Sequence, residues 1–297
     1  MTAPTGGGTP AEEIDIDAGL VSRLIAVQHP DLAHLEVRPG AVGWDNVMFR
    51  LGDDLAVRLP KRRVAVPLLA KEQIFLPTLA GSLPLPVSAP VRIGRPGDDF
   101  PWTWSILPWL PGKPADLAPP GPDQGGVWGG FLRALHRPAP EDAPRNPYRG
   151  VPLSARKGPV EERLARLRAH GVVTPMIEEF WSMALQTPLE TETWLHGDPH
   201  SRNVLTDQGR FSAVIDWGDM CVGDPATDLA SLWMLLDTPL ARDEAIAAYG
   251  GLSPATLIRA RGWAVMFGAM LLDAGLVDDP RLAAAGRVTL ERLHDGP

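Results

Sequence analysis

Apolar and polar positions alternate in short stretches over the first third of the chain. Apolar residues tend to recur at every second position in 35–39, 47–51 and 55–59, and strand-like segments follow at 91–94 and 102–109. Clusters of Gly and Asp separate the first three. A period of two that is broken by turn residues is typical of antiparallel strands. We therefore expect a small antiparallel sheet in this region.

Helical spacing occurs within this region and dominates the rest of the chain. Helices are expected at 17–28 and at 66–80, the second limited to two or three turns by Pro67 and Pro77. Later helices are expected at 127–136, 159–170, 175–186, 228–236, 240–249, 253–274 and 280–294. Gly275 is expected to lie just past the end of the longest one. One β-hairpin, with strands at 203–206 and 211–216, interrupts the helices.

This order of elements predicts an α+β fold with two lobes. Residues 1–107 form the expected N-terminal, sheet-containing lobe, and residues 108–297 form the larger helical lobe. The stretch 111–126, rich in Pro and Gly, is the best candidate for their connection, with a long surface loop as the alternative. Residues 1–13, rich in Gly, Pro and Thr, are expected to be disordered.

Composition narrows the class of protein. The chain has 44% hydrophobic and 22% charged residues, which is ordinary for a globular protein. Its net charge of −8 argues against a nucleic-acid partner, which requires a basic face. The single cysteine, Cys221, excludes an intrachain disulfide and fits a reducing cytoplasm. No uninterrupted apolar run has the length of a membrane span, and the start lacks the pattern of a signal peptide. We expect a cytoplasmic monomer or dimer without a membrane partner.

Three oxygen-bearing side chains surround the predicted hairpin. Asp198 and Asn203 lie on the loop before it, and Asp216 ends its returning strand. Because a hairpin returns to its start, Asn203 and Asp216 are expected to lie close together, with Asp198 nearby. Such a group suits Mg²⁺, which accepts one or two protein ligands together with phosphate oxygens and water. The arrangement is one that phosphoryl transfer requires.

The motif from His196 to Asn203, followed by Asp216, resembles the catalytic motif of the aminoglycoside phosphotransferase family, relatives of the protein kinases and choline kinases. The resemblance implies a protein-kinase-like two-lobe fold. It also implies that Asp198 is the catalytic base, that Asn203 and Asp216 bind Mg²⁺, and that His196 braces the loop. His200 lies at a variable position of the motif and is expected to face solvent or the substrate.

Two acidic residues, Asp224 and Asp228, follow the motif. Asp224 precedes a proline and Asp228 stands where a helix is expected to begin. We interpret them as turn and capping residues rather than as substrate ligands.

The N-terminal lobe supplies candidates for binding the nucleotide. The apolar residues of 55–59 share one face, so Arg58 points to the other. Arg58 stands where kinases keep a phosphate-binding lysine, and Glu72 is its expected ion-pair partner. Arginine departs from the common pattern but remains a good phosphate ligand. Lys61 and Lys71 are the alternatives.

Two further segments resemble nucleotide-binding parts of kinases. Gly43 and Asn46 belong to a turn that resembles the loop over the ATP phosphates, although a plain hairpin turn is the alternative. Ile106 and Pro108 lie in a segment that resembles the linker between kinase lobes, whose backbone binds adenine.

These observations predict an enzyme: an ATP-dependent O-phosphotransferase, with GTP as the alternative donor. Its acceptor is the hydroxyl of a small molecule such as an aminoglycoside or another antibiotic. The alternative in the same class is a metabolic kinase of the choline, homoserine or ketoamine type. A nucleotide-binding pseudokinase is the alternative from another class, and the intact Asp198, Asn203 and Asp216 argue against it. The Asp-Phe-Gly landmark of protein kinases is absent from the sequence.

The nature of the acceptor depends on which residues line the cleft. Acidic residues there would attract a cation such as an aminoglycoside, and the candidates are Asp237, Asp273, Asp278 and Asp279. An apolar lining would favour a macrolide, and the candidates, which also fit a helix core, are Trp233, Met234, Trp263, Met266 and Phe267.

Overall fold

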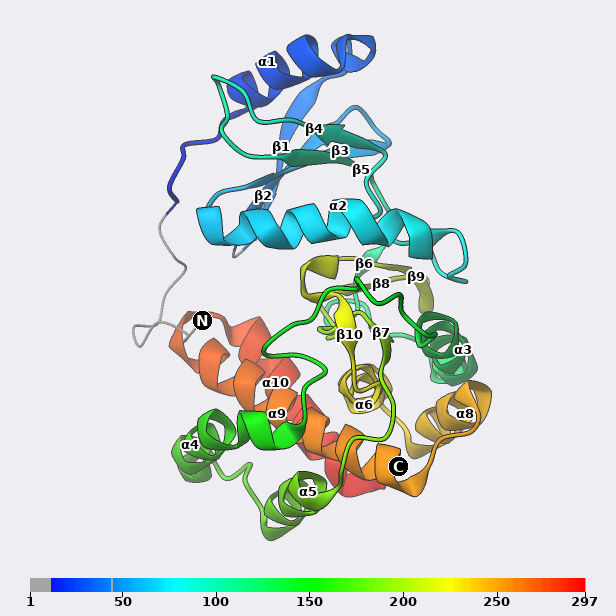
Figure 1. Ribbon diagram of the computed structural model, residues 1–297. Coiled ribbons are helices and arrows are strands. Elements are labelled where there is room, and N and C mark those ends of the chain that lie inside the picture. Colours follow the sequence, from blue (N-terminus) through cyan, green and yellow to red (C-terminus); the bar gives the residue numbers. More distant parts are fainter. Residues whose placement is uncertain (1–11, 44, 297) are drawn as a thin grey trace.

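The computed structural model describes residues 12–43 and 45–296. Five antiparallel strands in the order β1-β2-β3-β5-β4 form the sheet of the N-terminal lobe (Figure 1). Their bounds are Val37–Val42 for β1, Asn46–Leu51 for β2, Leu55–Pro60 for β3, Arg92–Gly94 for β4 and Trp104–Pro108 for β5. Each predicted strand segment overlaps one of these strands, so the expected sheet is confirmed.

Two helices cover the two faces of this sheet. Helix α1 (Ala18–Gln28) begins at Asp17, whose side chain accepts a hydrogen bond from the Leu20 N–H, and it buries its apolar residues against β2, β3 and β5. Helix α2 (Val66–Ala80) lies on the opposite face, between the sheet and the helical lobe (Figure 1). It extends over 15 residues and continues through Pro77, so the expected limit of two or three turns is wrong. Pro77 lies in the last turn and is exposed, where one lost backbone bond costs little.

The second lobe is mainly helical, as expected. Its helices are α3 (Gly125–Leu135), α4 (Lys157–Leu167), α5 (Pro175–Gln186), α6 (Ala226–Leu229), α7 (Ser231–Leu235), α8 (Pro239–Tyr249), α9 (Pro254–Asp278) and α10 (Pro280–Arg292). The segment expected as one helix at 228–236 is two short helices, α6 and α7.

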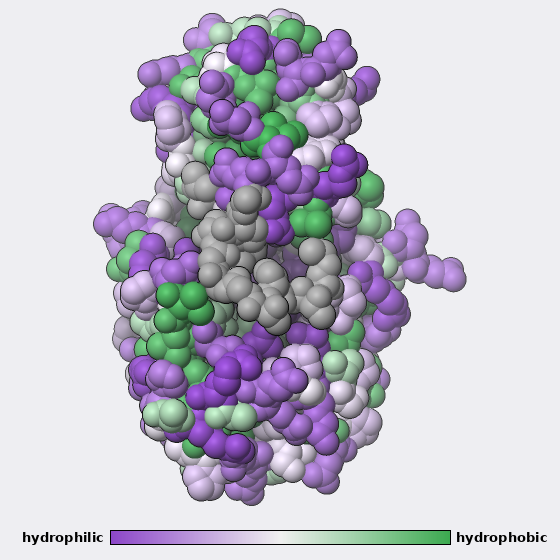
Figure 2. Space-filling model, turned by 90° about the vertical axis from the view of Figure 1, so that its left-hand side faces the viewer, coloured by the Kyte–Doolittle hydropathy of each residue, from purple (hydrophilic) through white to green (hydrophobic). Residues whose placement is uncertain are grey.

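Helix α9 is longer than expected because Gly275 does not end it. A Cβ atom at Gly275 would collide with the backbone of Ala283 on α10, so this glycine permits a close contact between the two helices. By length and composition α9 is also apolar enough to span a membrane, which the sequence did not suggest. However, 67% of its most apolar window is buried inside the structure, as in a core helix. The face shown in Figure 2 is mainly hydrophilic, with smaller hydrophobic areas between the polar residues.

Strands also occur in the helical lobe, and they flank or lie within the segment from His196 to Asp216. The predicted hairpin is present as β8 (Val204–Asp207) and β9 (Arg210–Val214), joined by a turn in which Gln208 and Gly209 have positive φ angles of 49° and 76°. It is not isolated, because β6 (Lys113–Pro114) pairs with β8. A second small sheet joins β7 (Thr193–Leu195) to β10 (Cys221–Gly223). The chain therefore reaches the helical lobe directly after β5, within the stretch expected to connect the lobes.

The N-terminal segment is fixed where the structure describes it. The Glu13 N–H donates to the Lys61 carbonyl over 2.9 Å, and Glu12 pairs with the Lys61 ammonium at 3.4 Å. The expected disorder of residues 1–13 therefore does not extend to these two residues, and residues 1–11 lie outside the described part.

Candidate active site

A buried histidine braces the loop that carries Asp198. The His196 Nε2 atom lies 3.0 Å from the Ile215 carbonyl, and its Nδ1 atom accepts a hydrogen bond from the Asp198 N–H at 3.2 Å. Since Nδ1 accepts, the ring proton is on Nε2 and is donated to Ile215. His196 thus links the catalytic loop to the residue before Asp216, as a bracing residue should.

Asp228 holds the same loop from the other side. Its carboxylate is fully buried and accepts hydrogen bonds from the N–H groups of His196 (2.7 Å) and Gly197 (2.8 Å). The Nε2 atom of His136 lies 3.3 Å from the same carboxylate. The prediction that Asp228 caps a helix is wrong. It lies within α6, and its partners are 31 and 32 residues away in the sequence, where a local pattern does not reveal them.

Asp224 has both the expected role and an additional one. Its Oδ1 atom accepts from the Ala226 N–H at 3.1 Å, which is a turn contact. Its carboxylate also forms a buried ion pair with Arg259, 2.7 Å away. This pair attaches the segment after β10 to helix α9.

Arg149 contacts the predicted catalytic base, and sequence reasoning missed it. Its Nη2 atom lies 3.3 Å from Oδ1 of Asp198 and 3.5 Å from Oδ2 of Asp219. The guanidinium lies over the ring of Phe267 at 5.0 Å, and only 9% of the side chain is exposed. Burial alone lowers the pKa of Arg149, but Asp198 and Asp219 outweigh it and raise that pKa. Arg149 is therefore a firmly charged partner that fixes one oxygen of Asp198.

Close backbone packing positions Arg149. Gly150 has a φ angle of 67°, and a Cβ atom there would lie 2.8 Å from the Cα of Gly223. The Gly150 carbonyl accepts from the Asp224 N–H at 2.9 Å. Asn146, on the same loop, donates to Oδ1 of Asp219 at 2.8 Å. No sequence pattern distinguished Arg149 from the other arginines, because these contacts arise only in the folded chain.

Asn203 and Asp216 lie side by side, as the hairpin predicted. The Ile215 N–H donates to the Asn203 carbonyl at 2.8 Å. The Asn203 Nδ2 group donates to the Asp198 carbonyl at 2.9 Å, which leaves Oδ1 as the atom able to bind a cation. Asp216 is exposed and has a φ angle of 60°, an unusual conformation for a residue other than glycine.

Asn203 and Asp216 fit Mg²⁺ better than a metal ion whose ligands must all come from the protein. Among the residues that the structure describes, no group of three or more His, Cys, Asp or Glu side chains is arranged to hold a metal ion. Mg²⁺ needs only one or two protein ligands where phosphate oxygens supply the others. An exposed carboxylate beside an amide oxygen matches that requirement.

The predicted pair of Arg58 and Glu72 is present. The guanidinium donates to both oxygens of Glu72, at 3.1 and 2.7 Å, and the two side chains are 6% and 1% exposed. Burial raises the pKa of Glu72, which the charge of Arg58 opposes and that of Asp216 reinforces. The pair therefore lies in the electrostatic range of Asp216.

The two alternative lysines have other surroundings. Lys61 is buried against Glu12. Burial lowers the pKa of Lys71, which the nearby Asp219 partly offsets.

The turn between β1 and β2 also faces Asp216. The Gly43 N–H donates to the Asn46 carbonyl at 2.9 Å, and Asp45 pairs with Arg62 at 2.8 Å. Burial raises the pKa of Asp45, and Asp216 is among the charges that raise it further. Trp44, in the same turn, lies outside the described residues.

The remaining predicted nucleotide residues belong to β5. Ile106 is fully buried and its carbonyl accepts from the Val91 N–H at 2.8 Å, while Pro108 pairs with Leu55. Both lie in the strand that leads to the crossover between the lobes, and their role toward adenine stays a prediction.

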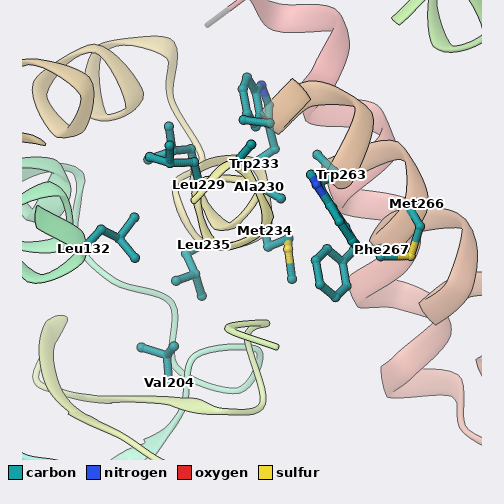
Figure 3. Packing of buried hydrophobic residues seen from close by; sticks show 14 of the residues in the cluster. Leu132, Val204, Leu229, Ala230, Trp233, Met234, Leu235, Trp263, Met266 and Phe267 are labelled. Atoms are coloured by element: carbon teal, nitrogen blue, oxygen red, sulfur yellow. The ribbon is translucent and has the colours of Figure 1, made fainter. Parts of the chain in front are cut away.

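Two of the four acidic candidates for the acceptor cleft are paired with arginines, and the other two, Asp237 and Asp278, are exposed. The five apolar candidates are buried. Asp273 pairs with Arg166 at 2.5 Å, and Asp279 pairs with Arg202 at 2.5 Å, so these two acids are neutralised. The apolar candidates Trp233, Met234, Trp263, Met266 and Phe267 are at most 5% exposed. All five belong to the hydrophobic core. Figure 3 shows Phe267 beside Met234, while Met266 points to another side of α9.

Comparisons with known proteins find similar folds among solved structures. The fold is similar to that of aminoglycoside 2′-phosphotransferase-IIIa in its GDP complex, with a TM-score of 0.65 and 18% identity, covering 94% of this chain and 98% of the other. It is also similar to a macrolide 2′-phosphotransferase from Brachybacterium faecium, with a TM-score of 0.57 and 21% identity, covering 95% and 99%.

Two comparisons rest on sequence. Hygromycin-B 4-O-kinase of Escherichia coli is 38% identical over 61 residues, which is 20% of this chain and only 18% of that relative. Residues 36–266 match the phosphotransferase enzyme family, which is most of the chain and includes the whole of the catalytic segment. The chain therefore belongs to the phosphotransferase enzyme family.

Proposed function

We propose that the protein transfers the γ-phosphoryl group of ATP, or alternatively GTP, to a hydroxyl of a small molecule, with Asp198 as the catalytic base. The observation that carries this proposal is the convergence of Asp198, Asn203 and Asp216 around one loop and hairpin, facing the Arg58–Glu72 pair. Solved complexes of the similar aminoglycoside phosphotransferases contain GDP or ADP, which supports a nucleotide as donor.

The N-terminal lobe, residues 1–107, would bind the nucleotide. Arg58, held by Glu72, contacts its phosphates, and the turn of Gly43 and Asn46 covers them. Ile106 and Pro108 lie beside the adenine. Asn203 and Asp216 would hold Mg²⁺, which neutralises charge on the phosphates during transfer.

Residues 108–297 would carry catalysis and bind the acceptor. Arg149 fixes Oδ1 of Asp198, and the His200 imidazole lies 3.5 Å from Oδ2. Oδ2 would orient the acceptor hydroxyl and accept its proton as the new O–P bond forms and the bond to the nucleoside diphosphate breaks. His196 and Asp228 hold the loop so that this oxygen keeps its position. Catalysis then depends mainly on positioning and on neutralising charge.

The family provides two kinds of acceptor. Antibiotic hydroxyls are the acceptors named for the similar aminoglycoside and macrolide enzymes, and a metabolic alcohol is the alternative. The pseudokinase alternative is disfavoured, because the base, the predicted metal ligands and the phosphate-binding pair are all present and mutually positioned.

The test is transfer from γ-labelled ATP to a panel of antibiotics and metabolites in the presence of Mg²⁺. Asp198→Ala is the control and should reduce the rate about 10²–10⁴-fold, which is the usual contribution of a general base, with the affinity for nucleotide unchanged. Full activity in this variant would remove Asp198 from the reaction. Nucleotide binding without transfer to any compound or to water would favour a pseudokinase.

A further inference from the structure

Three arginines form a basic group beside the catalytic base. Arg149 contacts Asp198 directly. Arg156, at the start of α4, and Arg163, within α4, are near enough to Arg149 that its charge lowers the pKa of each, in addition to the larger effect of burial. Arg156 also lies over the ring of Tyr148, the residue that precedes Arg149, which places Arg156 next to the loop that carries Arg149.

Two members of this arginine group are already paired. Arg149 has Asp198 and Asp219 as partners, and Arg163 lies 3.6 Å from Asp273. The Asp273 carboxylate is shared, because Arg166 binds it at 2.5 Å. Because Arg166 shares Asp273, the nearby carboxylates do not fully neutralise the positive charge of the arginine group.

Arg156 is the member without a negative partner. In the ranges 12–43 and 45–296 it forms no ion pair with a carboxylate, and the charges that affect it are those of Arg149 and Arg163. Its guanidinium lies over the ring of Tyr148 at 5.1 Å, and its Nε–H is buried without a hydrogen-bond partner. An unsatisfied buried donor on a cation that is surrounded by other cations is unfavourable unless an anion binds there.

We propose that the acceptor carries an acidic group, a carboxylate or a phosphate, and that Arg156 binds this group while the acceptor hydroxyl lies at Asp198. This proposal rests on the proposed phosphotransferase function and narrows its acceptor. A planar guanidinium binds a carboxylate or phosphate through two parallel hydrogen bonds, so the Arg156 fork suits either group. The ring of Tyr148 limits the orientations of that fork. A polycationic acceptor would be repelled by Arg156, the member of the group without a negative partner.

The experiment compares sugars that differ in charge and share the hydroxyls at C1, C3 and C4. Glucosamine, glucose, glucuronic acid and glucose 6-phosphate are supplied with MgATP, with kanamycin as a polycation, and transfer is measured with wild type, Arg156→Gln and Lys157→Gln. Lys157 is exposed and lines a separate groove of about 730 Å³ between α4 and α5, so its variant removes the same charge without touching the arginine group.

The expected results concern the preferred acceptor and the effect of each variant. An acidic sugar is phosphorylated with the highest kcat/KM, and comparison of the carboxylate with the phosphate member shows which group is preferred. Arg156→Gln lowers that kcat/KM roughly tenfold or more, as expected for losing hydrogen bonds to a charged group, mainly through KM of the acceptor. Lys157→Gln matches wild type, and KM for MgATP stays the same in both variants. Arg156→Lys retains part of the effect.

Several results would overturn the proposal. These are a preference for glucose, glucosamine or kanamycin, equal effects of the two variants, a change confined to KM of MgATP, or no transfer to either acidic sugar. Transfer to a neutral or cationic compound that still requires Asp198 would overturn the acidic acceptor and leave the phosphotransferase function intact. If the wild-type protein transfers phosphate from MgATP to none of these compounds and not to water, the proposed phosphotransferase function is contradicted.

Discussion

The Nη2 atom of Arg149 lies 3.3 Å from Oδ1 of Asp198, and the same guanidinium lies 3.5 Å from Asp219. A general base must present one lone pair in a fixed direction. This contact fixes Oδ1, so Oδ2, which lies 3.5 Å from the His200 imidazole, is the oxygen proposed to react. Because Arg149 is buried and held by a loop that packs on β10, the direction of the carboxylate is set before the acceptor arrives.

Arg149→Ala should therefore lower kcat with little effect on KM for MgATP. A displacement of about 1 Å in a reacting group costs on the order of 100-fold in rate, and we expect a loss of that size. Arg149→Lys should restore part of the rate, since a point charge replaces the guanidinium without its planar geometry. Steady-state kinetics with both substrates is the measurement.

The matched control is Arg145→Ala on the same loop. Arg145 forms an exposed pair with Glu192 and does not approach Asp198. Exposed pairs contribute little to stability, so this variant should behave as wild type. A rise in KM for MgATP with unchanged kcat in Arg149→Ala would place Arg149 in nucleotide binding instead.

Asp216 gives a prediction about Mg²⁺. Its φ angle of 60° is tolerated by Asn better than by Ala, so Asp216→Asn should keep the melting temperature of wild type. Since the amide lacks the negative charge, Mg²⁺ should no longer tighten ATP binding in this variant. Calorimetric titration of ATP with and without Mg²⁺ tests this, with Asp207→Asn at the exposed end of β8 as the control. An Mg²⁺ effect that survives in Asp216→Asn would exclude Asp216 as a ligand.

The Arg58–Glu72 pair allows stability and binding to be separated. Arg58→Ala leaves a carboxylate that is 1% exposed without its partner, so it should lose about 3–5 kcal/mol of unfolding free energy as well as raise KM for ATP. The double variant Arg58→Met with Glu72→Met should recover most of the stability, because an apolar pair replaces the ion pair. Its KM for ATP should stay high.

Denaturant unfolding and steady-state kinetics on both variants provide the test. A double variant that recovers normal KM for ATP would show that Arg58 has only a structural role. Arg58→Lys should fall between wild type and Arg58→Ala in KM, because the charge is kept and the fork is lost.

The parts of the site that follow from local pattern were predictable from the sequence. Alternation along β3 placed Arg58 on the face opposite Leu55, Val57 and Leu59, and Arg58 indeed meets Glu72 of α2 while those residues pack with α1. The reversal of the chain at the hairpin predicted that Asn203 lies next to Asp216, and it does. Both inferences rest on periods of two or on chain reversal, which short-range geometry determines.

The parts that depend on long-range packing were not predictable. Gly275 was expected to end α9 because glycine often follows a helix, but here it lies within one so that α10 approaches closely. Arg149 reaches Asp198 across 49 residues, through contacts that no single segment shows. Sequence-based predictions fail where a residue type usually has a local structural role but here has a role in tertiary packing.

Asp228 is the clearest case, and its tertiary role can be measured. Its carboxylate accepts from the N–H groups of His196 and Gly197 inside the protein, where an unsatisfied donor is expensive. Asp228→Asn presents one oxygen instead of two, so at least one of these donors loses its partner. We expect a loss of about 1–3 kcal/mol of unfolding free energy, together with a lower kcat, because the loop that carries Asp198 is held less firmly. The neighbouring Thr227→Val is the control: Thr227 is fully buried and its hydroxyl has no hydrogen-bond partner, so an isosteric apolar side chain should be neutral or slightly stabilising. If Asp228→Asn unfolds at the same denaturant concentration as Thr227→Val and keeps the wild-type kcat, the two backbone contacts do not hold the catalytic loop.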